Sequence, residues 1–407
     1  MAQRIDDGTV ELIFRRESGR AVATLTRLFG DIDIAEEAVQ EAFATATTRW
    51  RAAGIPLNPG GWIVTTAKNK ALDRIRREST RADRQAEALL LHQSTERDAE
   101  DRGVVDDDRL RLIFTCCHPA LASETQIALT LRLLAGLQTN EIARAFLVPE
   151  ATMAQRLVRA KHKIRDAGIP YRVPEASELP SRIPPVLAVV YLIFNEGYAA
   201  SHGDDLARSE LCEEAVRLAR LLVALLPDEP EATGLLALLL LIDARRVART
   251  TDGGSLVVLA EQDRSRWDTS LIAEGLELVR RCLRRNQPGF YQIQAAINAV
   301  HCDAPSGEAT DWMQILQLYD QLLTIAPTSV VALNRSVAVA EVDGPGIALE
   351  LVSKLDLDGY YPYHATRADL LRRLGRSDEA RVEYLAALAN TGNESERGFL
   401  EDRLQLL

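Results

Sequence analysis

The stretch GWIVTTAKNKALDRIRR, residues 61–77, predicts a helix with an unusual outer face. At about 100° per residue, one face is apolar and consists of Val64, Ala67, Ala71 and Ile75. The opposite face mixes one aromatic with polar and charged residues: Trp62, Thr66, Asn69, Asp73 and Arg76. Beside it run Lys70, Arg74 and Arg77. Stacking surface together with cations is what single-stranded nucleic acid requires; the alternative is a surface helix whose Trp covers the edge of a core.

The composition around this stretch favours an all-α fold. The chain has 407 residues, 47% of them hydrophobic and 5% aromatic, enough for several domains with sizeable cores. Turn signals separate helix-length segments, and alternating β-branched patterns are scarce. The longest apolar run, residues 235–242, is far shorter than the roughly 20 residues of a membrane-spanning helix. With no apolar signal segment at the N-terminus, we expect a cytoplasmic protein without a membrane partner.

Charge is distributed unevenly along the chain. The formal net charge is −11, yet residues 1–174 hold 26 Lys and Arg against 24 Asp and Glu, and the remainder holds 22 against 35. Two windows, residues 62–84 and 140–172, each carry seven basic and three acidic side chains. Local basic windows in an acidic chain indicate nucleic-acid binding at two places.

No pattern in the sequence indicates catalysis or a bound metal. The five cysteines are an odd number and form no C-x-x-C pair: Cys116, Cys117, Cys212, Cys282 and Cys302. We expect reduced structural thiols, with neither disulfides nor a zinc site. A nucleophile paired with a base and a Gly-rich phosphate loop are both lacking. The expectation is a protein that is not an enzyme and needs no cofactor.

A first helical block is expected over residues 7–78, with breaks at Gly30 and in the turn-rich segment 54–61. Between the breaks lies AEEAVQEAFATATTRW, residues 35–50, whose apolar face opposes a face rich in Glu and Gln. This acidic helix either binds a partner or is simply solvated. Residues 79–108 are polar and charged, which predicts a flexible linker.

A second block, residues 109–168, contains a helix-turn-helix pattern. A helix over 139–146, a turn at 147–149 and a second helix over 150–166 are expected. In the second helix the packed face is predicted to hold Met153, Leu157, Ala160 and Ile164. Donors and cations face outward: Thr152, Gln155, Arg156, Arg159 and Lys163. Such a face suits reading of a DNA major groove; the alternative is a helical hairpin with a charged outer surface.

The remaining chain differs in composition. Residues 169–185 contain five prolines, which predicts an interrupted helix, a linker and a domain boundary. In the extension, residues 186–407, LLVALLPDEPEATGLLALLLLIDA is similar to LLTIAPTSVVALNRSVAVAEVDG. A repeat near 34 residues predicts stacked helical hairpins of the tetratricopeptide (TPR) type.

Residues 9–168 resemble the sigma factors of bacterial RNA polymerase, specifically the extracytoplasmic-function (ECF) group that retains sigma domains two and four. The motifs that carry the resemblance occur in order: GDIDIAEEAVQEAF, WIVTTAKNKALDRIRR and LRLLAGLQTNEIARAFLVPEATMAQRLVRAKHKIR. The resemblance implies domain two at 7–78, a linker at 79–108 and domain four at 109–168. It also implies two partners, bacterial core RNA polymerase and promoter DNA.

The resemblance assigns roles to residues at the matching positions. Core polymerase would contact Glu37, Gln40, Glu41 and Phe43. The −10 promoter element would be recognised and melted by Trp62, Lys68, Asn69, Lys70, Arg74, Arg76 and Arg77. The −35 element would be read by the outward donors and cations of the helix-turn-helix named above. Ala151 and Ala154 stand where the family commonly has Gly and Lys. The −35 contacts are therefore open in detail.

The extension resembles a sigma-factor subgroup with TPR-like C-terminal repeats, in the blocks VVYLIFNEGYAAS, RWDTSLIAEGLELVRRC and GFYQIQAAINAVHC. That subgroup is not expected to need a dedicated anti-sigma factor, and the extension itself is the suspected regulator. Asn195, Glu196 and Tyr198 are candidates for an intramolecular contact with the sigma domains or for a ligand site. The alternative is a helix end stopped by Gly197.

Three functions are compatible with these patterns. The first is a transcription initiation factor modulated by its extension, which either activates or masks the sigma domains. The second is a stand-alone helix-turn-helix regulator with a TPR-like sensor, and the third is a scaffold. A stand-alone regulator has no use for a strand-opening helix with Trp62 and Asn69, so the first function is favoured.

Overall fold

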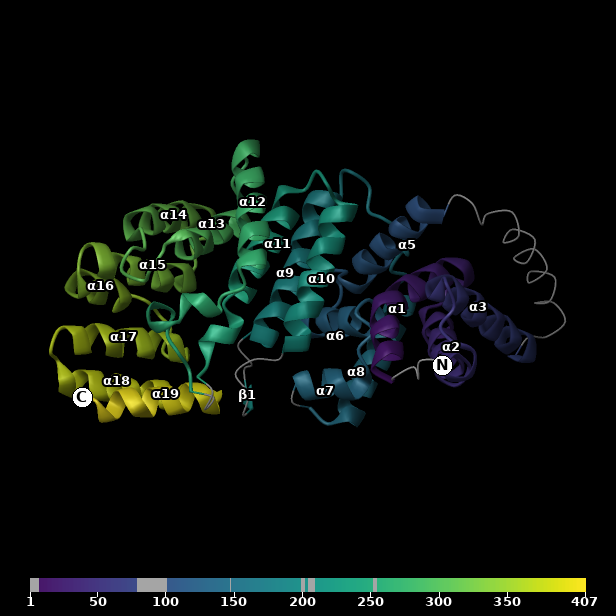
Figure 1. Cartoon of the computed structure of the whole chain (residues 1–407), viewed down its shortest axis with the longest axis horizontal. Coiled ribbons are helices and arrows are strands. Elements are labelled where there is room, and N and C mark those ends of the chain that lie inside the picture. Colours follow the sequence, from purple (N-terminus) through teal and green to yellow (C-terminus); the bar gives the residue numbers. More distant parts are fainter. Residues whose placement is uncertain (1–6, 79–100, 147, 199–201, 204–208, 252–254) are drawn as a thin grey trace. The chain divides into compact units, whose positions relative to one another are not determined.

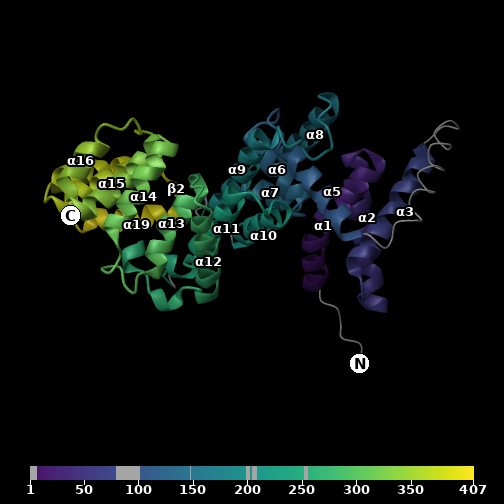
Figure 2. The same cartoon turned by 90° about the horizontal axis from the view of Figure 1, so that it is seen from above.

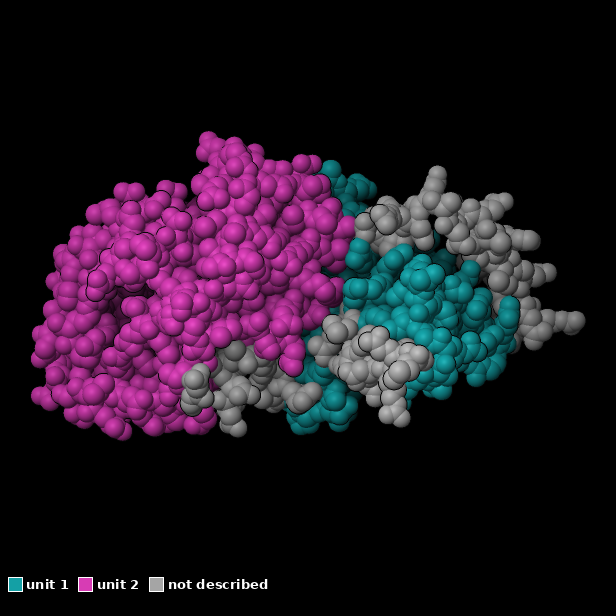
Figure 3. Space-filling view, in the orientation of Figure 1, with its two compact units in different colours: residues 1–189 teal, residues 190–407 magenta. Residues whose placement is uncertain are grey.

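The structure is a computed structural model that describes residues 7–78, 101–146, 148–198, 202–203, 209–251 and 255–407. It confirms the predicted all-α fold (Figure 1), since the described part contains only two strands of two residues each. The chain forms two compact units, residues 1–189 and 190–407 (Figure 3).

Unit 1 contains the segments that resemble the two sigma domains. Its helices are α1 (Asp7–Phe29), α2 (Ile32–Ala53), α3 (Pro59–Glu78), α5 (Asp101–Cys116), α6 (Ser123–Leu133), α7 (Thr139–Ala145), α8 (Glu150–Asp166) and the first part of α9 (Leu179–Tyr198). Helices α1, α2 and α3 pack on one another, and α6 and α7 pack on α8. The first group contains α3 and the second contains α8, the two helices that carry the predicted nucleic-acid surfaces.

The break between α1 and α2 has a local cause in the sequence. Gly30 has φ of 70°, a left-handed conformation that ends α1. Asp31 then caps α2, because its carboxylate accepts hydrogen bonds from the backbone N–H groups of Asp33 and Ile34. At the other end of α2, Gly54 has φ of 87° and stops the helix. The predicted boundaries of the acidic helix thus follow from its two capping residues.

The predicted linker 79–108 lies mostly outside the described residues, and its last part is not a linker. Residues 101–108 belong to helix α5. The reason is tertiary: the fully buried carboxylate of Asp108 lies 2.7 Å from Arg27 Nε of α1 and 3.1 Å from Arg111 Nη1. Tyr171 donates from its hydroxyl to the carbonyl of Ala23, at 2.8 Å. An aspartate that looks solvated in the sequence therefore joins α5 to α1.

The predicted linker 169–185 also differs in its second half. Helix α9 begins at Leu179 and runs through Pro184 and Pro185. Both prolines lie beyond the first four residues of the helix, so each one removes a backbone hydrogen bond. The apolar residues that follow, Val186 among them, are buried. Burial of this run outweighs the two missing N–H donors, and the boundary between the units falls within the helix.

Unit 2 continues as a series of helices, each packed on the next (Figures 1 and 2). They are α10 (Ser209–Leu225), α11 (Pro230–Asp243), α12 (Thr269–Arg285), α13 (Phe290–Asp303), α14 (Trp312–Ile325), α15 (Ser329–Val342), α16 (Pro345–Val352), α17 (Tyr361–Arg373), α18 (Ser377–Asn390) and α19 (Glu394–Gln405). Three short 3₁₀ helices, η1 (Arg246–Arg249), η2 (Leu259–Glu261) and η3 (Arg264–Arg266), lie between α11 and α12. Strand β1 (His202–Gly203) pairs in parallel with β2 (Gly392–Asn393).

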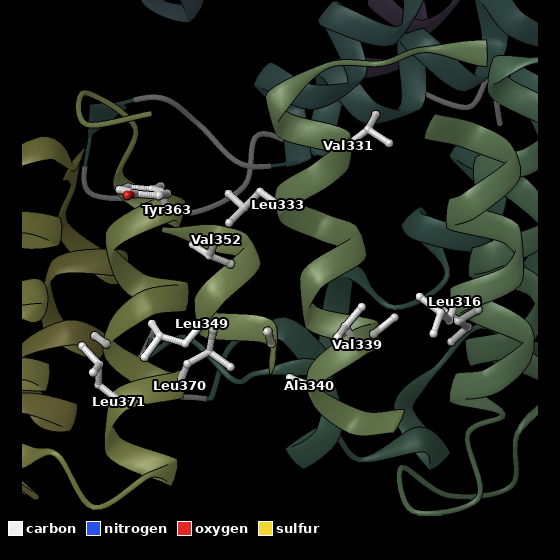
Figure 4. Close-up of a cluster of buried hydrophobic side chains, with 14 of the residues drawn as sticks. Leu316, Val331, Leu333, Val339, Ala340, Leu349, Val352, Tyr363, Leu370 and Leu371 are labelled. Carbon is white, nitrogen blue, oxygen red and sulfur yellow. The ribbon is translucent and has the colours of Figure 1, made fainter. Parts of the chain in front are cut away.

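The C-terminal part of unit 2 shares one hydrophobic core. Leu333 and Val339 of α15 pack with Leu349 and Val352 of α16 and with Leu370 of α17 (Figure 4). All five side chains are buried. This confirms the helical nature of the extension, whereas its kinship with TPR repeats stays a prediction.

Within the described residues no helix has the length and apolar character needed to cross a membrane. The cysteines are free thiols, and all except the half-buried Cys302 are buried. Burial raises the pKa of Cys117 to about 12 and that of Cys212 to about 12, so both stay protonated at neutral pH.

Candidate nucleic-acid interface

Helix α3 presents the polar face that the sequence predicts, rotated slightly. Its fully buried side chains are Ile63, Ala67 and Ala71, with Leu72 nearly so. Val64 and Ile75, predicted for the core, are only half-buried. The core stripe therefore lies closer to Trp62 than the periodicity indicated.

Trp62 is half-buried rather than fully outward. Its ring packs edge-to-face on the buried ring of Trp50 in α2, with 5.3 Å between the ring centroids. Such aromatic pairs contribute about 0.5–1.5 kcal/mol beyond the buried area. Trp62 is thereby held in one place with part of its surface open, while Asn69, two turns further along α3, is exposed. A fixed aromatic beside an amide is a platform on which an unstacked base can lie.

The cations of α3 lie beside acids of α2. Arg74 forms an ion pair with Glu37, and Lys70 Nζ lies 3.6 Å from Glu41 Oε2. On α3 itself, Arg76 Nη1 lies 3.8 Å from Asp73 Oδ1, and Arg77 donates to the Asp73 carbonyl. Lys68 is half-buried. The predicted −10 residues and the predicted polymerase-contacting acids are thus neighbours on adjacent helices.

The remaining polymerase-contacting candidates are less accessible. Gln40 donates from Nε2 to Glu36 Oε1 at 3.0 Å. Phe43 is only 6% exposed and packs edge-to-face on Phe14 of α1, with 4.2 Å between centroids. Both residues line a cavity of about 430 Å³ that also borders Gly136. A partner group that enters this cavity would contact Phe43.

Helix α8 has the two faces that the sequence predicts. Its buried residues are Met153, Leu157, Ala160 and Ile164, which confirms the predicted packed face. Gln155, Arg159 and Lys163 are exposed, and Thr152 and Arg156 are half-exposed. Arg156 Nη1 lies 3.2 Å from Glu124 of α6. Because Pro149 and Glu150 set the start of α8 after the turn, the outward donors begin in its first turn.

A cluster that sequence reasoning missed joins α2 to α6 and α8. Arg132 Nε lies 2.6 Å from Glu36 Oε1, and Lys161 Nζ lies 2.9 Å from Glu36 Oε2 and 2.6 Å from Asp33 Oδ1. Burial alone would raise the pKa of Glu36, but the two cations lower it overall. Burial alone would lower the pKa of Lys161, whereas Glu36 and Asp33 raise it. One signal of this cluster was present in the sequence: Lys161 is a cation of α8 that lies next to the predicted outward face of that helix without belonging to it.

Of the three candidates at the end of α9, Tyr198 packs within unit 2. Tyr198 stacks on Phe194 at 5.6 Å between centroids, and the Arg249 guanidinium lies 3.9 Å from the Tyr198 ring. Gly197 does not end the helix; it is buried where a Cβ would lie 2.7 Å from the backbone N of Cys212. Asn195 and Glu196 are half-buried. Their regulatory role stays a prediction.

Comparisons with known proteins find two families in the segments that contain α3 and α8. Residues 13–81 match the family Sigma-70 region 2, and residues 111–164 match Sigma-70, region 4. Residues 182–283 match a family of unknown function, DUF6596. No solved structure matches the chain significantly.

Two relatives extend the comparison. An uncharacterized protein of Rhizobium meliloti (strain 1021) is 43% identical over 98% of this chain and 96% of its own length. A probable ECF RNA polymerase sigma factor, SigI, of Mycobacterium tuberculosis is 28% identical over 39% of this chain and 56% of its own length. Regions 2 and 4 in this order define a DNA-binding sigma factor. The chain thus contains the two regions of an ECF-type sigma factor and carries a DUF6596 segment after region 4.

Proposed function

We propose that this protein binds bacterial core RNA polymerase and directs it to promoters through α3 and α8. The observation that carries the proposal is the pair of outward polar faces on separate helical frames. One holds Trp62 and Asn69, and the other holds Gln155, Arg159 and Lys163. The acids Glu37 and Glu41 on α2 supply the contact with polymerase.

The two faces suit two different tasks. Opening a duplex costs a few kcal/mol for each unstacked base, and the open side of Trp62 can offset that cost by stacking at about 1–3 kcal/mol per base. Gln155 and Arg159 can address base edges in an intact major groove, and Lys163 can address phosphates. Region 2 would therefore melt the −10 element while region 4 reads the −35 element.

The compact form of unit 1 cannot reach both elements at once. Their centres lie about 25 base pairs apart, or roughly 85 Å at about 3.4 Å per base pair. A compact unit of 189 residues has a radius of gyration of only about 16 Å. We infer that the contact between region 2 and region 4, including the Glu36 cluster, opens when polymerase and promoter are bound.

Runoff transcription with core polymerase tests the proposal. We expect transcripts only when the protein is added, and we expect Trp62→Ala with Asn69→Ala to abolish strand opening detected by permanganate footprinting. Trp62→Phe, which keeps a ring on Trp50, serves as the matched control and should retain part of the activity. Tight duplex binding without polymerase and no transcript would favour a stand-alone regulator instead.

We propose further that unit 2 modulates the sigma regions. The charge difference between the basic windows of the sigma regions and the acidic extension supports this proposal. A truncation should retain Arg182, because its Nη2 donates to the Phe114 carbonyl at 2.8 Å within unit 1. A chain ending after Val189 that transcribes like the full chain would exclude this modulation.

A further inference from the structure

Unit 2 contains a cavity that the sigma-factor activity does not use. Its volume is about 530 Å³, within the range of about 300–1,000 Å³ that small-molecule sites occupy. It is bordered by η2, η3, the end of α13, the start of α14 and helices α15, α17, α18 and α19. Elements separated widely in the sequence thus enclose one space.

The walls of the cavity are largely apolar and aromatic. Trp312, Tyr361 and Phe399 contribute rings, and Leu256 and Val258 contribute aliphatic groups. The His301 ring stands edge-to-face to Trp312, with 5.3 Å between centroids. Burial, with Arg245 and Arg264 nearby, lowers the pKa of His301 to about 4, so its ring is neutral at pH 7. These walls fit an aromatic or aliphatic body.

The carboxylates that border the cavity are already engaged. Three of them form ion pairs with Arg side chains that border the same cavity: Glu261 with Arg403 at 2.8 Å, Glu341 with Arg373 at 2.7 Å and Asp369 with Arg372 at 2.6 Å. The fourth, Glu396, accepts hydrogen bonds from the hydroxyls of Tyr361 and Thr391. None of these acids neutralises the fourth bordering arginine, Arg264.

Arg264 is oriented by carbonyl groups rather than by an acid. Its Nη1 donates to the carbonyls of His301 and Ala304, both at 2.7 Å, and its guanidinium lies 4.4 Å from the Trp267 ring. Within the described residues no carboxylate lies within ion-pair distance of it, and its Nε and Nη2 have no hydrogen-bond acceptor. Arg264 therefore offers donors in a fixed direction at the wall of the cavity.

A second cation strengthens the positive potential behind this wall. Arg245 is only 6% exposed, and its guanidinium lies 5.9 Å from the same Trp267 ring. Its Nη2 donates to Asn298 Oδ1 at 2.6 Å, while Nε and Nη1 have no partner in the part of the chain that is described. A buried cation without a counter-charge is costly, and an anion bound nearby reduces that cost.

We propose that this cavity binds a small organic anion, with its acidic group on Arg264 and its aromatic or aliphatic body against Trp312, Tyr361 and Phe399. Such a ligand gives the extension a chemical input of its own. The site goes beyond the proposed promoter selectivity, and binding can be measured without polymerase or DNA. An aromatic carboxylate or sulfonate has the required chemistry.

Two fluorescent probes of similar shape separate the contribution of charge from that of the apolar walls. The full chain is titrated with the anionic 8-anilinonaphthalene-1-sulfonate and with the uncharged N-phenyl-1-naphthylamine. We expect saturable binding of both probes at one site. Arg264→Gln should weaken binding of the anionic probe about tenfold or more, since it removes a charge-assisted hydrogen bond to the acidic group. Binding of the uncharged probe should change less than about twofold.

Matched variants keep the interpretation unambiguous. Arg266→Gln removes the same charge from an exposed position of η3 and should leave both affinities unchanged. Arg264→Lys, which keeps a cation, should retain most of the anionic probe's affinity. Ala365→Trp fills the cavity and should block both probes, with thermal unfolding showing that each variant is folded.

Three results would overturn the proposal. The first is equal affinity of the anionic probe for the original chain and Arg264→Gln. The second is equal weakening of both probes by Arg264→Gln, which would make Arg264 a packing residue only. The third is probe binding that Ala365→Trp does not reduce, which would place the probe elsewhere.

Discussion

The carboxylate of Glu36 lies between Arg132 and Lys161, 2.6 Å from the Nε of the first and 2.9 Å from the Nζ of the second. Glu36 belongs to α2 of region 2, whereas its partners belong to α6 and α8 of region 4. All three side chains are at most 14% exposed. This cluster therefore holds the two sigma regions together in the free protein.

Removing the charge of Glu36 should loosen this contact. Glu36→Gln leaves two partly buried cations without their shared acid and should lower the free energy of unfolding by roughly 1–3 kcal/mol. Urea unfolding measures this, and a double-mutant cycle with Lys161→Met should show coupling of about 1 kcal/mol or more. Glu37→Gln is the control, because Glu37 is 53% exposed and its pair with Arg74 should contribute less than about 1 kcal/mol. Equal effects of the two substitutions would refute a special role for Glu36.

The stability of unit 1 should depend on pH through the same carboxylate. The pKa of Glu36 in the folded protein is lowered from 4.5, despite burial, by Arg132 and Lys161. A lowered pKa contributes stability that is complete above the unfolded value and disappears as pH falls through the folded value. The stability difference between the original chain and Glu36→Gln should hold from pH 7 to about pH 5 and shrink below pH 4.5. A difference that stays constant down to pH 3 would contradict this assignment.

Gly19→Ala should open the same interface without changing any charge. A Cβ at Gly19 in α1 would lie 2.5 Å from the backbone oxygen of Leu134, at the end of α6, so one of the two backbones has to move. If the regions separate on the promoter, this variant should lose stability yet bind core polymerase more tightly, measured by fluorescence anisotropy. Gly346→Ala is the control, because no atom lies within 4 Å of a Cβ at that position. It should change neither the stability nor the polymerase affinity by more than a small amount. Weaker polymerase binding by Gly19→Ala would count against opening.

Ala154→Lys should strengthen duplex binding by region 4. Ala154 is exposed on α8 beside Gln155, so a lysine there adds a cation to the outward face. One further phosphate contact should steepen the slope of log affinity against log salt concentration by about 0.9. Filter binding of the polymerase complex to promoter DNA at several salt concentrations measures the slope. Ala120→Lys, an exposed position outside α8, is the control and should leave the slope unchanged.

Helical periodicity was sufficient to predict which face of a helix is buried where that face depends on spacing within the same helix. The buried face of α8 follows from Met153, Leu157 and Ala160 at spacings of three or four residues, and the structure has the same face. The half-burial of Trp62 was not predictable in this way, because it depends on Trp50 in another helix. Likewise, the helical residues 101–108 were predicted as linker, since nothing near Asp108 in sequence announces its pairing with Arg27.

The sequence by itself determined the all-α fold, the order of the two sigma regions and the polar faces of α3 and α8, because each depends on spacing along one helix. Only the tertiary structure decided which charges meet. Glu36 and its partners are 96 and 125 residues apart in the chain, and Arg264 borders a cavity formed by eight elements of unit 2. Ion pairing and cavity shape depend on distances between different elements, and the spacing of residues within one helix does not determine those distances.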